Sequence, residues 1–410
     1  MGIQFNMICK LSIGKDSEKF HPYEEQKYAS NWINRTLKFN ATAGDNNFLL
    51  QVKGGKFEDE HNLVYLFSQS GVDDSGNKIK GEPLTIPFKE RLTSPRLVEV
   101  AEWKKFVVDL EKPNFRWELT KALEKIKEGK ELTDAEIKKF GARDEKGLEN
   151  ALEKSNKKRK EFITEWDYAE FIKKLIDSGK YDGKKFRVSG EYQMQYSDQK
   201  GQFYSNYVPN RIYLANDDEE EVATATVDFY FDSNSLDAGS ALENGKYYVN
   251  GYTFVHDNAR KANVPAPYTV VINAAKDDSE LEKKREKIQV SRFEVEDEDT
   301  VYQYGIVVNL LNGAQKQDIS EDDLTEEQLD SIMLGEITLD DIRRELGGSI
   351  YGDRVVENVF SKPARGFSKG REETDYTSDD LAIKPLTNDE DETELFDDDN
   401  EDLFDDDDIL

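Results

Sequence analysis

The segment "KKFRVSGEYQMQY", residues 184–196, alternates between two kinds of side chain. Successive residues of a β-strand point to opposite faces, so alternate positions share a face. One face carries the apolar and aromatic side chains of Phe186, Val188, Tyr192, Met194 and Tyr196, and the other carries Arg187, Glu191 and Gln193. The pattern predicts a strand that packs one face on a core.

Four further segments have the same β-rich character, and clusters of Gly, Asn and Asp separate them. They are residues 202–215, 222–231, 246–255 and 267–274. Two more strand-like runs, at 288–295 and 301–311, close or extend the same sheet. Five short strands with helices around them predict an α+β fold that is mainly antiparallel, with an OB-like Greek-key barrel over residues 181–312.

Two segments before this barrel differ in the spacing of their apolar residues. Residues 1–95 contain short apolar runs between turn residues and are predicted to form an N-terminal β domain. Residues 96–180 are predicted to form a helical insert. Its signals are a capping box at Thr133 and Glu136, and three apolar residues at helical spacing, Leu119, Leu123 and Ile126.

The segments after the barrel are increasingly polar. Residues 313–348 resemble a helical hairpin with a break at Gly335 and a second helix capped by Thr338. Residues 349–410 are predicted to form a flexible linker and a disordered acidic tail, because they contain too little apolar surface to offset the entropy of ordering.

The charges of the chain are distributed unevenly. Residues 1–215 hold 38 basic and 34 acidic side chains, whereas residues 216–410 hold 18 basic and 52 acidic ones, which gives the formal net charge of -30. Such an asymmetry indicates a front part that tolerates a polyanion and a rear part that repels one.

Few residues suit a metal or redox site. The single cysteine, Cys9, excludes an internal disulfide framework, and the three histidines are too scattered to suggest a zinc site. We expect no metal and no cofactor.

No apolar run approaches the roughly 20 residues of a membrane span, and the first residues lack the pattern of a signal peptide. We therefore expect a cytoplasmic protein.

Aromatic side chains are concentrated in the predicted barrel. Nineteen of the 45 aromatic residues lie between Trp166 and Tyr268, interleaved with Lys and Arg. Unpaired nucleic acid requires this mixture, because bases stack on aromatic rings, at about 1 to 3 kcal/mol per base, while cations hold phosphates. The predicted DNA-binding residues are Lys184, Lys185, Arg187, Tyr192, Tyr196, Lys200, Phe203, Tyr204, Tyr207, Arg211, Tyr213, Tyr247 and Tyr252.

Two other interpretations of the same residues stay open. Tyr and Phe are favoured in strands, so these rings could form the core. Neighbours such as Phe203 and Tyr204 must point to opposite faces of a strand, which leaves at least one ring of each pair outside. Separately, Asp228 and Asp232 could begin the metal-binding carboxylate cluster of a nuclease.

The chain ends in "ELFDDDNEDLFDDDDIL", residues 394–410. Fourteen acidic and no basic residues lie after Pro385, so the segment is a polyanion that competes with nucleic acid for cations. Its apolar side chains can dock on another protein. The predicted partner-binding residues are Leu395, Phe396, Leu403, Phe404, Asp405, Asp406, Asp407, Asp408, Ile409 and Leu410.

With its aromatic, basic barrel and this tail, the chain resembles the bacterial and phage single-stranded DNA-binding proteins. In that family an OB-fold core is followed by a linker and an acidic tail with an apolar end. The bacterial tail ends in acid-Ile-Pro-Phe, whereas this chain ends in acid-Ile-Leu. The resemblance implies a phage protein of DNA replication or recombination that binds single-stranded DNA and recruits replication or recombination partners through its tail in the host cytoplasm.

Enzymatic motifs are missing from the sequence. It contains neither a phosphate-binding Gly-x4-Gly-Lys-[Ser/Thr] loop nor a Gly-x-Ser-x-Gly elbow, so we expect a protein that is not an enzyme. Two alternatives to DNA binding remain. One is a viral structural or assembly protein that the acids keep soluble, and the other is an inhibitor whose carboxylates imitate DNA.

Overall fold

The structure, a computed structural model, describes residues 2–58, 62–72, 78–241, 245–257, 259–275, 279–297, 300–318, 324–334, 337–338, 349–367 and 370–383. The acidic tail with its ten candidate partner-binding residues lies outside the described residues. So does the second helix expected after Thr338.

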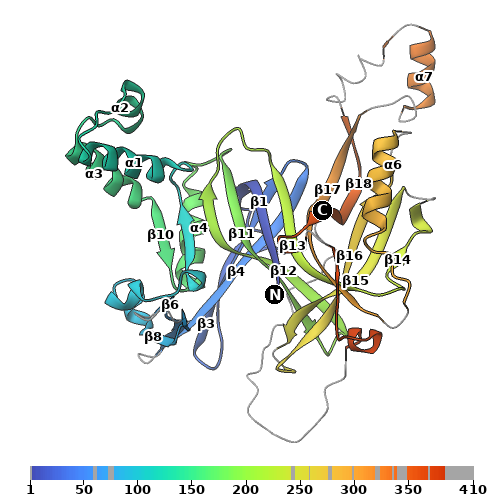
Figure 1. Ribbon diagram of the computed structural model, residues 1–410, viewed down its shortest axis with the longest axis horizontal. Helices are drawn as coiled ribbons and strands as arrows, with labels where there is room; N and C mark the ends of the chain where they lie inside the picture. The colour runs from blue at the N-terminus through green and yellow to red at the C-terminus, as the bar shows by residue number, and fades with distance from the viewer. Residues whose placement is uncertain are drawn as a thin grey trace, which may run out of the picture.

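Five strands from the first half of the chain pair in a closed circuit, which we call unit 1 (Figure 1). They are β1 (Ile3–Ser12), β3 (Trp32–Ala43), β4 (Asn46–Phe57), β11 (Lys185–Ser197) and β12 (Gln202–Leu214). β1 is antiparallel to β3 and β11, β4 to β3, and β12 to β11. A parallel contact between Leu50 of β4 and Tyr207 of β12 closes the circuit.

A helix packs against unit 1 at the third strand. α4 (Glu165–Asp177) precedes β11 along the chain and contacts β3 and β4. The approach is close at Gly54, where an added Cβ would lie 2.4 Å from the Cβ of Glu165. Glycine is therefore required at this position of β4, because any side chain would push the helix away.

The second half of the chain forms a second closed circuit, unit 2, with the same strand order. Its strands are β13 (Val222–Phe231), β15 (Lys246–Asp257), β16 (Ala262–Asn273), β17 (Tyr302–Asp318) and β18 (Ser349–Pro363). The third and fifth strands, β16 and β18, are parallel, as in unit 1. α6 (Glu280–Val290) again lies between the third and fourth strands in sequence.

Antiparallel pairing of β1 with β13, from Gln4–Thr226 to Ile8–Val222, joins the two units into one mixed sheet of 15 strands. The predicted fold class is therefore wrong. Residues 181–312 form no single OB-like barrel, since β11 and β12 belong to unit 1 and β13 begins unit 2. The sheet is larger than a small barrel core. Alternation of apolar and polar residues predicts that a segment is a strand. Which strands pair with it depends on segments far away in the sequence.

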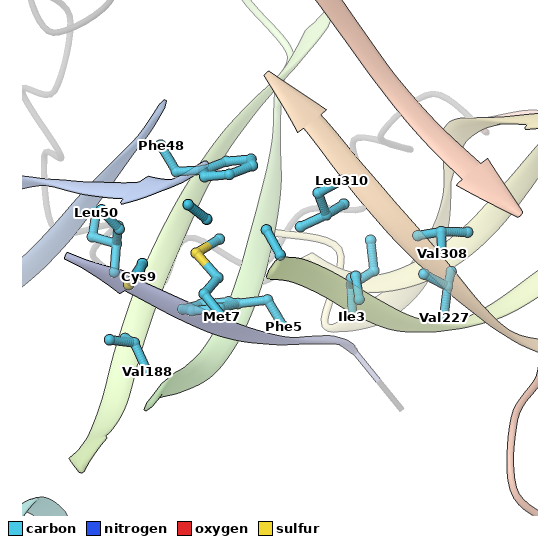
Figure 2. Packing of buried hydrophobic residues seen from close by; sticks show 14 of the residues in the cluster. Ile3, Phe5, Met7, Cys9, Phe48, Leu50, Val188, Val227, Val308 and Leu310 are labelled. Carbon is cyan, nitrogen blue, oxygen red and sulfur yellow. The ribbon is translucent and has the colours of Figure 1, made fainter. Parts of the chain in front are cut away.

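One continuous core serves both units. Figure 2 shows β1 side chains, among them Phe5 and Met7, between Phe48 of unit 1 and Leu310 of unit 2. Burial in this core raises the pKa of the Cys9 thiol to about 12, which keeps it protonated and unreactive. β1 is therefore the strand that couples the two halves.

The segment 58–164 leaves unit 1 between β4 and α4 and forms the left side of Figure 1. Thr133 and Glu136 form the predicted capping box at the start of α2, which confirms that signal. The elements of the segment are β5 (Leu63–Phe67), β6 (Gly71–Val72), β7 (Lys78–Ile79), β8 (Pro83–Pro87), the 3₁₀ turns Phe88–Glu90, Pro95–Val98 and Glu102–Lys104, β9 (Phe106–Asp109), α1 (Phe115–Lys127), α2 (Asp134–Phe140), α3 (Glu145–Asn156) and β10 (Arg159–Phe162).

The remaining described elements are short. They are β2 (Tyr23–Lys27) beside β3, β14 (Leu236–Asp237) beside β15, α7 (Glu326–Met333), β19 (Glu372–Glu373) beside β17 and the 3₁₀ turn Ser378–Leu381.

Candidate nucleic-acid interface

The β11–β12 hairpin, which carries most of the predicted site, extends from unit 1 across unit 2. Near its tip, Met194 and Phe203 pack against a buried cluster on the β15–β16 hairpin. Arg260 of unit 2 pairs with Asp198 at the tip, with 2.6 Å between guanidinium nitrogen and carboxylate oxygen. One face of this hairpin is therefore occupied by the protein itself.

Four predicted aromatic residues lie on that occupied face. The rings of Tyr192 and Tyr207 are 4.6 Å apart, and Phe5 and Phe48 contact Tyr207 edge-on. Burial raises the pKa of both tyrosines. Closer to the tip, Tyr196 packs on Phe203, and their ring centroids are 5.1 Å apart. Tyr192 and Tyr207 thus lie at the junction of the two units, and Tyr196 and Phe203 lie against unit 2, so the four rings form no open stacking platform.

The opposite face of the hairpin and its turn carry the other four predicted residues of β12 and the turn. Lys200 lies 5.6 Å from the ring centre of Tyr204. Further along β12, Arg211 donates to the carbonyl of Glu102, and its other terminal nitrogen lies 3.5 Å from the hydroxyl of Tyr213. Arg211 and Tyr213 thereby lie beside the 3₁₀ turn Glu102–Lys104.

The predicted cations at the start of β11 are paired with the segment that links the two units, residues 216–221, which we call the acidic loop. Lys184 lies 3.1 Å from Asp217, and Arg187 lies 2.6 Å from Glu219. Lys185 donates to the main-chain carbonyl of Glu219. A phosphate would therefore compete with the acidic loop for these cations.

The acidic loop is held in a defined conformation. The amide of Asn216, followed by the Arg187 guanidinium, keeps the pKa of the Glu219 carboxyl below its usual value. Glu221 pairs with Lys10 at 2.7 Å and accepts from the amide of Gly44, and these contacts lower its pKa although burial raises it. The loop is therefore part of the folded structure at neutral pH.

The two remaining predicted tyrosines lie in unit 2. The Tyr247 hydroxyl donates to Glu286 of α6 at 2.6 Å, and this hydrogen bond raises the pKa of Tyr247. Tyr252 pairs with Tyr230 of β13, beside a cluster of Tyr230, Phe254 and Tyr376. The fold does not bring them together with the predicted residues of β11 and β12.

An aromatic surface that sequence reasoning missed lies in the segment 58–164. It consists of Leu63, Tyr65, Phe67, Trp103 and Lys104, and we call it the Trp103 surface. Tyr65 is 75% and Trp103 62% exposed. The rings of Phe67 and Trp103 are 5.7 Å apart, and the Lys104 ammonium lies 4.9 Å from the Trp103 centre and 5.7 Å from that of Phe67.

The local sequence explains why these rings stay outside. β5 is apolar on both faces, and Leu66 on one face packs with Leu84, Ile86 and Val100. Among the described residues, β5 pairs only with β8 in a two-stranded sheet, and no other strand covers the face with Tyr65. The available signal was the apolar run "LVYLF", which has no polar face.

The Trp103 surface adjoins part of the predicted site through the hydrogen bond from Arg211 to Glu102. Within the described residues, Lys104 forms no ion pair, in contrast to the cations beside the acidic loop. The candidate site is therefore the Trp103 surface together with Arg211 and Tyr213.

No protein-family model matches the chain, and no curated protein matches it. Among solved structures, the chain is weakly similar to a deletion mutant of the single-stranded DNA-binding protein from Thermus aquaticus. The TM-score is 0.27 at 9% sequence identity, over 76% of this chain and 86% of that one. A similarity at this level carries no argument about fold or function.

Within the described ranges, no helix is long and apolar enough to span a membrane. The described residues also contain no group of three or more His, Cys, Asp or Glu side chains placed to hold a metal ion. The Asp232 carboxylate accepts hydrogen bonds from the hydroxyls of Ser235 and Ser378 instead.

Proposed function

We propose that this chain binds single-stranded DNA without strong sequence preference and without catalysing a reaction on it. The observation that carries the proposal is the pair of outward rings, Phe67 and Trp103, with the Lys104 ammonium over both. Such a surface offers stacking faces to successive bases and a cation to the phosphate between them.

Energetics favour this use of the Trp103 surface. An exposed group of large apolar side chains has an unfavourable contact with water, and such groups commonly mark interaction sites. Each base stacked on Tyr65, Phe67 or Trp103 contributes about 1 to 3 kcal/mol. Arg211, beside the surface, adds a second cation for the strand.

A more specific proposal about the biological role rests on the sequence of the acidic tail. We propose a role in phage DNA replication or recombination, in which residues 386–410 compete with DNA for cations and recruit partner proteins. Deletion of these residues from the full chain then tightens DNA binding, most strongly at low salt, where the competing polyanion acts best. Unchanged or weaker affinity after deletion contradicts this assignment.

Quenching of tryptophan fluorescence by oligo-dT tests the main proposal. We expect quenching of the full chain, with an affinity that falls steeply as salt is raised, because bound phosphates release counterions. Absence of affinity for any single-stranded oligonucleotide overturns the proposal and favours an assembly surface. Competition with DNA for a basic protein favours a DNA mimic.

A further inference from the structure

A cavity of about 130 Å³ lies where the two units meet. Unit 1 contributes Ile3, Tyr192 and Tyr207 to its walls, and unit 2 contributes Tyr268, Leu310 and Asn358. The volume is well below the roughly 300 to 1,000 Å³ of sites for drug-sized ligands. The cavity therefore suits a single small ring.

Within the part of the chain that the structure describes, two tyrosine hydroxyls of this cavity form no hydrogen bond. Tyr192 donates to Ser205 at 2.7 Å, but the described residues offer no partner to the hydroxyls of Tyr207 and Tyr268. Only 6% of Tyr268 is exposed. Both residues line the cavity, whereas the buried, unpartnered hydroxyl of Tyr168 belongs to α4, outside it.

The three tyrosines line the same cavity. Burial, followed by the neighbouring hydroxyls of Tyr207 and Tyr192, raises the pKa of Tyr268 well above its usual value. All three groups are therefore neutral at physiological pH, and each can donate or accept a hydrogen bond. Leaving a buried hydroxyl unpaired costs about 1 to 3 kcal/mol, which a ligand with polar edges recovers.

The remaining walls define the class of ligand. The cavity lining contains no Lys, Arg, Asp or Glu among the described residues, which disfavours a phosphate or a carboxylate. Apolar walls from Ile3 and Leu310 and the Tyr192–Tyr207 ring pair suit a flat ring. Asn358 donates its amide to the carbonyl of Thr269 at 3.1 Å, and its side-chain oxygen remains as an acceptor.

We propose that this cavity receives one nucleobase of a bound strand, with the base edge hydrogen-bonded to Tyr207 and Tyr268. The assignment rests on the proposed function, because only a bound strand delivers a base at high local concentration. It places one base contact at the junction of the two units, away from the Trp103 surface. A strand held at both sites binds both halves of the molecule at once.

Tyrosine-to-phenylalanine variants of the full chain test this assignment. Tyr268→Phe and Tyr207→Phe keep the rings and remove the hydroxyls, so each is expected to weaken oligo-dT binding about fivefold, the value of one net hydrogen bond. Tyr168→Phe is the matched control, since it removes a buried, unpartnered hydroxyl outside the cavity. We expect its affinity to equal that of the wild type.

The outcomes separate the two proposals. If the wild type binds no oligonucleotide, the proposed function fails. If the wild type binds and both cavity variants bind as tightly as the wild type, only the nucleobase site fails.

Photo-cross-linking of iodouracil-substituted oligo-dT to the wild type tests the site without a variant. Cross-links at Tyr207 or Tyr268 support the site, and cross-links confined to other residues overturn it. Free thymidine is expected to bind far more weakly than the oligonucleotide, and equal affinity indicates a nucleoside site instead.

Discussion

Units 1 and 2 have the same strand order, the same parallel pair and a helix in the same place, but the connection from the third strand to that helix differs. In unit 2, residues 274–279 lead from the third strand directly to α6, whereas in unit 1 the connection to α4 runs from residue 58 to residue 164. The exposed aromatic surface lies in that long connection and not in the strands. The strands therefore supply a common scaffold, and the insertion distinguishes the halves.

The two units also hold their helices differently. In unit 1, buried Arg35 donates to the carbonyl of Trp166 and to Glu170 of α4, and its guanidinium lies 3.6 Å from the Trp166 ring centre. In unit 2, Glu286 of α6 accepts from the Tyr247 hydroxyl and from the amide of Ala275. The buried charge of Arg35 therefore holds α4 on unit 1, whereas hydrogen bonds to Glu286 hold α6 on unit 2.

The largest expected effect is on the helix contact of unit 1. Arg35→Met removes the guanidinium that donates to Glu25, Glu170 and the Trp166 carbonyl, and leaves Glu170 with Lys174 and Glu25 with the Tyr23 hydroxyl. We expect the free energy of unfolding to fall by about 3 kcal/mol, because the buried guanidinium is bonded to two carboxylates and a carbonyl and lies on the Trp166 ring, and all these contacts are lost together. Urea denaturation measures this.

Arg96→Met is the control for this variant. Arg96 is half exposed and pairs with Glu99 at the surface, so its loss should cost less than about 0.5 kcal/mol. Equal costs for the two variants would show that Arg35 does not hold α4 on unit 1.

The next effect concerns the insertion that distinguishes unit 1. Trp103→Ala removes a stacking ring and is expected to weaken oligo-dT binding by about 1 to 3 kcal/mol, or roughly 5- to 150-fold. Trp117 on α1 is 64% exposed, against 62% for Trp103, and Trp117→Ala is the matched control. Equal losses in both variants would remove the Trp103 surface as the site.

Most strands of the two units could be predicted from the sequence, but their arrangement could not, and β18 lies in the segment expected to be a linker. The alternation in 184–196 and in 222–231 predicts β11 and β13 correctly, because burying one face of a strand requires a period of two. β1 pairs with β3, β11 and β13, and no local pattern in "IQFNMICKLS" indicates three partners. Long-range pairing therefore decides that two units form.

The candidate site was predicted only in part for a related reason. Lys184 and Arg187 have the composition of a phosphate site, but residues 216–221 fold back onto them, and composition does not reveal such pairing. Arg211 and Tyr213 remain outward beside Trp103, which is separated from them by about a hundred residues in sequence. Proximity of that kind follows only from the fold.

A smaller effect is expected at the helix contact of unit 2. Tyr247→Phe removes the hydrogen bond to Glu286, which stays bonded to the amide of Ala275. We expect a loss of about 1 kcal/mol in the free energy of unfolding, the net value of one hydrogen bond. A loss as large as that of Arg35→Met would contradict the difference between the two helix contacts.

The smallest effect compares two cations of unit 1. Lys104 lies over rings of the Trp103 surface without an ion pair among the described residues, so Lys104→Ala should remove one phosphate contact and lower the salt dependence of oligo-dT binding by about 0.7 in the log–log slope. Arg187 is already neutralised by Glu219 at 2.6 Å, so Arg187→Ala should leave the slope unchanged.

Lowering the pH gives a second test of the difference between Arg187 and Lys104. The pKa of Glu219 is lowered in the folded chain, so its ion pair stabilises the loop above the carboxyl's unfolded pKa and is lost as the pH falls through the folded pKa. Arg187→Ala should therefore begin to reduce affinity only in acid, where protonated Glu219 releases the guanidinium for phosphate. If Arg187→Ala instead lowers the slope at neutral pH as much as Lys104→Ala does, DNA displaces the acidic loop, and the cations of β11 belong to the site as the sequence suggested.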